Sequence, residues 1–281
     1  MSAPLKRRQR NMSEKGDHDA ASDVTRRSVL RSSTGIAAVG AASLLATAIS
    51  TPPAVAVEGD SGSLSRENAL PASVAGIRIP NTELTRETVR FARNASSVTL
   101  FNHVMRTYLY SAVLFERRGI RYDRELAFVA AVLHDLGLLE TYQVPGERFE
   151  VGGADAAQRF LRKQGVPEDR VAVVWDAIAL HTSSSIASRK RPEIAMVSVG
   201  SAVDFAGQGL QQIPADALED ILTAFPREDF KQNAVHTILS ICRMNPMSVV
   251  MHPFAEVGRR HLPDFAVPTV EDMLFATPFE E

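Results

Sequence analysis

The apolar residues from Glu83 onward recur at three- and four-residue steps, and this spacing restricts most of the chain to helices. Between about Ser97 and Arg118, one such stripe consists of Leu100, Phe101, Val104, Tyr108, Ala112 and Phe115. Gly, Pro and Asn separate the successive segments, and no segment sustains the alternation of a strand. With 281 residues, 45% of them hydrophobic, the sequence predicts an all-α fold with ample core.

Start and stop signals divide this region into expected helices. They cover residues 97–118, 123–136, 153–164, 167–181, 192–206, 216–224 and 227–244. Asp123 is the expected N-cap of the second, and Gly137 is expected just past its end with a positive φ. Residues 140–151 read as a loop, and the tail from Pro246 is expected to wrap the outside.

The first 56 residues resemble an export signal. The pair Arg26-Arg27 precedes an apolar run over residues 36–49, and residues 54–56 offer an Ala-x-Ala cleavage site. This run is shorter than the roughly 20 residues that span a bilayer, so no stable membrane anchor is expected. We therefore expect twin-arginine export, cleavage near Ala56 and a periplasmic or extracellular protein. The division expected is 1–56 signal peptide, 57–82 linker and arm, 83–262 helical domain and 263–281 C-terminal tail.

Composition excludes several classes of function. The 31 basic and 33 acidic residues nearly balance without a basic stripe, which argues against a nucleic-acid partner. Cys242 is the single cysteine, so neither an intramolecular disulfide nor a thiolate zinc site is expected. Any metal must then be held by His and carboxylate side chains. The sequence does not determine the oligomeric state, and it is compatible with a homo-oligomer.

The adjacent pair His134-Asp135 offers a neutral nitrogen and an anionic oxygen, both of which divalent metals accept. Adjacent residues on a regular helix face different ways, so the pair is expected where the helix ends. Alone the dipeptide is a weak signal. His103, His181 and Asp204 strengthen it, because each lies in an apolar helical pattern of its own.

This order, a helical His, then His-Asp, then a distant Asp, resembles the HD-domain metal-dependent phosphohydrolase superfamily, and within it most closely the cyanamide hydratase family. The segments that carry the likeness are residues 101–108, 133–138, 149–155, 174–183 and 201–204. The resemblance implies an HD-domain helical bundle. It also implies that a divalent metal is held by His103, His134, Asp135 and Asp204. Zinc is favoured, and iron or manganese would also suit this ligand set.

Several further side chains have more than one possible role. His181 is favoured as an acid/base or substrate contact, with metal ligand or loop histidine as alternatives, and Asp135 is a plausible proton acceptor. Arg106 orients a substrate oxygen or pairs with an acidic residue. Glu150 fixes a ligand histidine or is a solvated loop carboxylate, and Asn102 senses substrate or is simply polar. The remaining residues, His236, His252, His261 and Trp175, are read as structural or surface.

Three functions follow from these residues. In the first, metal-activated water attacks the carbon of a small nitrile-like C–N substrate and yields an amide or urea. In the second, it attacks phosphorus in a nucleotide or phosphoester, which would need several cationic donors; Arg106 is one, and Arg189–Arg191 would add others if their loop folds inward. In the third, the protein is a non-catalytic secreted module that binds a metal or ligand.

Overall fold

The computed structural model describes residues 70–279. The expected signal peptide and most of the linker lie outside the described residues, so their assignment stays a prediction. Within residues 70–279, none of the helices combines the length and the apolar character that crossing a bilayer requires.

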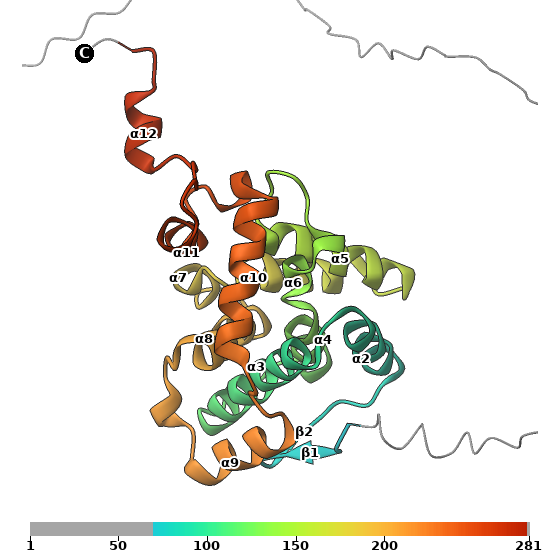
Figure 1. Cartoon of the computed structure of the whole chain (residues 1–281). Helices are drawn as coiled ribbons and strands as arrows, with labels where there is room; N and C mark the ends of the chain where they lie inside the picture. The colour runs from blue at the N-terminus through green and yellow to red at the C-terminus, as the bar shows by residue number, and fades with distance from the viewer. Residues whose placement is uncertain (1–69, 280–281) are drawn as a thin grey trace, which may run out of the picture. The chain divides into compact units, whose positions relative to one another are not determined.

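Most of the described chain is helical, as the apolar spacing predicts (Figure 1). The larger helices are α2 (Glu83–Ala95), α3 (Val98–Arg117), α4 (Arg124–Leu133), α5 (Phe149–Lys163), α6 (Glu168–Ala179), α8 (Pro192–Ala206), α9 (Ala215–Ala224) and α10 (Phe230–Met244). Shorter ones are α7 (Ser184–Ala187), α11 (Phe254–His261) and α12 (Val270–Phe275), with 3₁₀ turns η1 (Leu136–Leu138), η2 (Glu140–Tyr142), η3 (Leu210–Gln212) and η4 (Pro246–Val249). The all-α prediction is confirmed.

A small hairpin precedes the helices. β1 (Ser73–Val74) pairs antiparallel with β2 (Ile77–Arg78) across a turn in which Ala75 and Gly76 both have positive φ. Such a pair of φ values belongs to the type I′ turn that matches strand twist. Val74 and Ile77 are buried in the main core, so this part of the expected linker packs on the domain instead of leaving it.

α3 is the central helix. Every residue from Phe101 to Phe115 is buried, and α4 and α8 pack against it. The closest approach is at Gly200 of α8, where an added Cβ would lie 1.9 Å from the carbonyl oxygen of Thr107. The small residues expected to let this helix approach its neighbours therefore do so, and α8 brings its C-terminal end beside His103 on α3.

α4 begins as predicted and ends earlier. The side chain of Asp123 accepts a hydrogen bond from the amide of Leu126, which confirms the N-cap. The helix stops at Leu133, three residues before the expected end, and η1 follows. Gly137 lies in η1 and is not among the positive-φ glycines, so the expected C′ role is wrong. It is glycine for another reason: a Cβ there would meet the carbonyl oxygen of Phe149 at 1.8 Å.

α5 begins earlier than expected, and this moves Glu150 out of a loop. The helix starts at Phe149 because its first turn packs directly on η1 through two glycines, Gly137 and Gly153. Glu150 is completely buried in that first turn, where a carboxylate also favours the helix dipole. The reading of Glu150 as a solvated loop carboxylate is therefore wrong.

The C-terminal part does more than wrap the outside. α10, η4 and α11 enclose a second apolar cluster with α5, formed by Phe149, Ile238, Ile241, Cys242, Val249, Ala255 and Val267. Figure 1 shows α10 crossing in front of α3, in agreement with the contacts between these two helices. This cluster fixes the segment around residue 252 against the start of α5.

The approach of α8 to α3 gives a prediction. In a helix, Gly→Ala normally stabilises by about 1 kcal/mol. We expect Gly200→Ala instead to lower the free energy of unfolding by about 1–3 kcal/mol, since the methyl group overlaps a backbone oxygen that cannot rotate away. Urea denaturation followed by circular dichroism measures this. A variant more stable than the wild type would contradict the close contact.

Candidate metal centre

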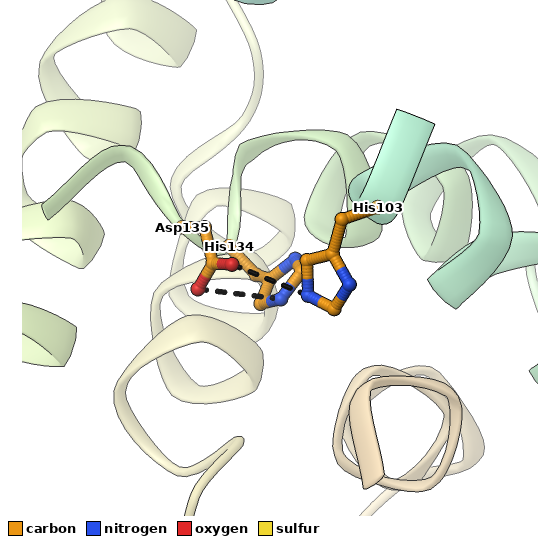
Figure 2. A group of neighbouring side chains, drawn as sticks. All are labelled: His103, His134 and Asp135. Atoms are coloured by element: carbon orange, nitrogen blue, oxygen red, sulfur yellow. Dashed lines mark ion pairs between the residues drawn. The ribbon is translucent and has the colours of Figure 1, made fainter. Parts of the chain in front are cut away.

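The end of α4 turns His134 and Asp135 toward the same point. His134 is the C-cap residue, and Asp135 has φ −102° and ψ 14°, outside the helical range. This break lets two adjacent side chains face one way, as the sequence argument requires. His103 reaches the same point from α3, and Figure 2 shows its imidazole and that of His134 directed at the Asp135 carboxylate.

Three imidazoles aim the same nitrogen at this carboxylate. Nε2 of His103 lies 3.3 Å from Oδ2 of Asp135, and Nε2 of His134 lies 3.4 Å from Oδ1. Nε2 of His181, just beyond the end of α6, lies 3.7 Å from Oδ1. All four side chains are buried. Ligand atoms of His103, His134 and Asp135 all lie within 4.8 Å of one another, which is the spacing of a metal site.

The other ring nitrogens are occupied, which fixes how each ring is turned. Nδ1 of His134 and Nδ1 of His181 donate to the carbonyls of Ala131 and Ile178, at 2.8 and 2.7 Å. Nδ1 of His103 lies 2.7 Å from a carboxylate oxygen of Asp204. A proton on each Nδ1 leaves the lone pair on Nε2, and this is how proteins orient metal-ligating histidines.

The pKa values of the group follow from burial and charge. Burial lowers the pKa of His134 to about 3, so this imidazole is neutral, as a ligand must be. Burial alone would raise the pKa of Asp135, but the histidines around it outweigh burial and hold the pKa well below its usual range. Burial likewise opposes protonation of His103, but Asp135 and Asp204 hold its pKa above the usual value.

A divalent cation fits these donors. Nε2 of His134 is buried and, among the residues that the structure describes, has no hydrogen-bond partner, although an unpaired buried nitrogen is costly. A cation beside Asp135 would supply the missing partner and balance the buried carboxylate. His103, His134 and Asp135 would hold it, with His181 directed at the same carboxylate. Nitrogen and oxygen donors suit zinc, iron or manganese.

Asp204 lies behind His103. Its carboxylate contacts Nδ1 of His103, the nitrogen that faces away from Asp135, and it lies outside the group of converging ligand atoms. Arg106 donates two hydrogen bonds to it at 2.8 Å, and Arg227 donates another at 2.6 Å. Burial would raise the pKa of Asp204, but His103 and Arg106 outweigh burial and lower it. A direct ligand role for Asp204 stays a prediction; in this structure its carboxylate positions His103.

Arg106 is a structural partner of Asp204. The side chain is completely buried, and its remaining donor binds the carbonyls of Phe225 and Pro226. It does not line the cavity described below, so the structure favours pairing over the catalytic substrate contact also considered for it. Asn102 likewise donates to the carbonyl of Pro226 at 3.0 Å and is absent from the cavity wall.

Glu150 forms a second buried polar cluster next to the first. It accepts hydrogen bonds from Nε2 of His252 at 3.1 Å, from the Thr182 hydroxyl and from Arg148. Nδ1 of His252 accepts from the amide of Phe254, so Nε2 carries the proton. Glu150 therefore fixes no metal-facing histidine directly. It joins α5 to the residue after His181 and to the C-terminal segment.

A cavity of about 510 Å³ opens from the metal-ligand group, within the usual range for ligand sites. His103, Asp135 and His181 face it, and its other walls come from α3, α8, α10 and residues 252–254. Sequence reasoning missed Phe230, Asn233, Thr237, His252 and Phe254 in this wall. The first three lie on α10, which carries no motif, and the other two belong to the C-terminal segment, whose contact with Glu150 spans 102 positions.

Comparison with known families agrees with this geometry. Residues 100–222 match the family model described as HD domain. With the helical fold and the His103–His134–Asp135 group, this match supports assignment to the HD-domain superfamily, whose members are typically metal-dependent hydrolases. A search of the curated proteins finds no match. The finer likeness to cyanamide hydratases stays a prediction.

The position of Asp204 gives a test of the ligand set. Because the Asp204 carboxylate contacts Nδ1 of His103 and lies outside the converging ligand atoms, we expect Asp204→Asn to weaken binding of zinc or manganese by about 10- to 100-fold without abolishing it. Asp135→Asn, which removes a converging anionic donor, should abolish it. Calorimetric titration of both variants measures this, with thermal denaturation as the folding control. Equal and complete loss in both would instead make Asp204 a direct ligand.

The Glu150 cluster predicts a pH dependence of stability. Burial would raise the pKa of Glu150, but hydrogen bonds from His252, Arg148 and Thr182 lower it below its usual range. The stabilisation that the ionised Glu150 carboxylate gives to the folded state is therefore fully present above the unfolded pKa of about 4.3. It is lost as the pH falls below that value.

We expect the wild type to exceed Glu150→Gln by about 1–3 kcal/mol in unfolding free energy at pH 7. This difference should shrink as the pH falls through 4 toward 3. Denaturant titrations at several pH values measure it. A difference that stays constant down to pH 3 would contradict an ionised, hydrogen-bonded Glu150.

Proposed function

We propose that this protein is a metal-dependent enzyme that hydrates an uncharged, nitrile-like C–N substrate. The observation that carries the proposal is the cavity beside the ligand group. Among residues 70–279, no lysine or arginine lines it, while His103, Asp135 and His181 do. A bound divalent cation supplies an activated water near neutral pH. Addition of one water across a C≡N bond gives an amide, with no leaving group and no change that requires a redox partner.

The chain's own residues suit this reaction. Asp135 keeps its charge in a buried site and would accept a hydrogen bond from a water molecule beside the substrate carbon. His181 faces both Asp135 and the cavity, and its Nε2 carries a lone pair, so it is located to take a proton from that water and pass it to the substrate nitrogen. Neutral polar groups in the wall, including Thr182, Ser201 and Asn233, match the donors and acceptors of an amide product.

Phosphoester hydrolysis, the commoner activity of the superfamily, is the alternative. It needs cationic donors around the phosphoryl group. The guanidinium of Arg106 is hydrogen-bonded to Asp204 and to two backbone carbonyls. Residues 189–191 do not line the cavity. Arg189 binds the carbonyl of Ser185, Lys190 pairs with Asp176 and Arg191 with Glu193. Among residues 70–279, no lysine or arginine lines this cavity, and this favours the neutral substrate. A non-catalytic binding module would keep the same ligands without turnover.

Export of the protein is consistent with this proposal. The export assignment itself rests on the sequence of residues 1–56 alone. Twin-arginine export carries folded proteins, so a metal loaded before export would stay in place. The same proposal includes a metal that is zinc, iron or manganese.

The assay that tests the function compares products directly. We expect metal-loaded protein to form urea or amide from cyanamide and simple nitriles, and to release no phosphate from nucleotides or phosphodiesters. Chelation should abolish the activity and added metal should restore it. Asp135→Asn should be inactive, whereas Asp176→Asn, a carboxylate paired with Lys190 at the surface, should match the wild type. Phosphate release without amide would replace this function by the alternative.

A further inference from the structure

The cavity is far larger than the smallest substrates of the proposed reaction would fill. It measures about 510 Å³, whereas the two atoms of a nitrile group need only the part next to Asp135, His103 and His181. Sites of this volume usually bury molecules of many heavy atoms. The remaining space must accommodate either water or a further part of the substrate.

The chemistry of the apolar part of the cavity wall favours a further part of the substrate over water. Phe205, Phe230, Ala234, Ile238 and Phe254 line it. The Phe230 ring stacks on the imidazole of His103 at 4.8 Å between centroids, so apolar surface begins directly at the metal end. Water gains few hydrogen bonds on such a wall, and an apolar group that displaces it is stabilised in proportion to the area buried.

This wall is held in place before any substrate binds. Phe254 stacks on Phe149 with ring centroids 5.1 Å apart and planes 9° apart, and both belong to the interface between the start of α5 and the C-terminal segment. The hydrogen bond between His252 and Glu150 anchors the same segment from the polar side. A preorganised apolar wall contributes to affinity without the cost of ordering.

The two ends of the cavity come from different parts of the chain. The metal end lies within residues 100–222, which match the HD domain, whereas Phe230, Ala234, Ile238 and Phe254 follow that match. Most of the apolar wall therefore comes from the segment beyond the HD match.

We propose that the substrate carries an uncharged apolar group, about the size of a five-carbon chain or a phenyl ring, beside the C–N group that is hydrated. This inference rests on the proposed function for the reacting group. The apolar group lies along α10 and Phe254, with the C–N group at Asp135. Molecules as small as cyanamide react slowly because they leave this wall unused.

A series of nitriles tests the inference. Hexanenitrile has four methylenes more than acetonitrile, and each buried methylene is worth about fourfold in kcat/KM, so we expect a preference of up to about 200-fold. 6-Aminohexanenitrile, which has a similar length and a cationic end, should lose most of this gain. Ala234→Phe fills the cavity space beside the apolar wall. It should lower the preference for hexanenitrile over acetonitrile, measured as the ratio of their kcat/KM values, at least tenfold. Val235→Phe, on the exposed side of α10, should leave the ratio unchanged.

A binding measurement separates this inference from the proposed reaction. Calorimetry with the amide products should give hexanamide at least tenfold tighter than acetamide, with the difference reduced in Phe205→Ser, an exposed rim position that leaves the core intact. If no nitrile reacts but hexanamide still binds more tightly, the hydration function is wrong and the apolar-group inference stands. If acetonitrile reacts as fast as hexanenitrile and the two amides bind equally, the inference is overturned.

Discussion

A buried carboxylate among three imidazoles is the interaction on which the rest of this structure depends. Asp135 is 7% exposed, and an isolated charge at that depth would cost far more than a domain's net stability. It is tolerated because Nε2 atoms of His103, His134 and His181 converge on it, and a bound divalent cation would complete the charge balance. The fold can be read as the framework that brings these helices to one carboxylate.

The imidazoles are oriented in two ways, by backbone carbonyls and by a carboxylate, and these contacts explain much of the surrounding architecture. His134 and His181 donate to carbonyls at the ends of their own helices. His103 instead needs Asp204 from another helix, and that carboxylate is itself held by Arg106 and Arg227. Gly200 makes the arrangement possible, because it lets α8 lie against α3 closely enough for Asp204 to reach His103.

The cavity joins the polar group of candidate metal ligands to an apolar wall, and both are consistent with the proposed uncharged substrate. Cations near the site are neutralised by Asp204 or paired at the surface, so the cavity offers little to a phosphate. The wall from α10 and Phe254 offers burial to an uncharged group. Glu150 links the two ends, since it contacts the segment after His181 and the segment that carries Phe254.

Local patterns in the sequence were sufficient for the helical class and for Asp123 as an N-cap, because periodicity and capping act over a few residues. The convergence of His103 with His134 and Asp135 was predicted from the family resemblance, since no local pattern joins positions 31 residues apart. Local patterns misread Gly137, whose role depends on the carbonyl of Phe149, and they placed Glu150 in a loop. Only the tertiary structure decided that Asp204 and Arg106 stand behind His103 and that His252 and Phe254 line the cavity. Those contacts join residues about a hundred positions apart, and no short-range pattern encodes which distant helix face will meet another.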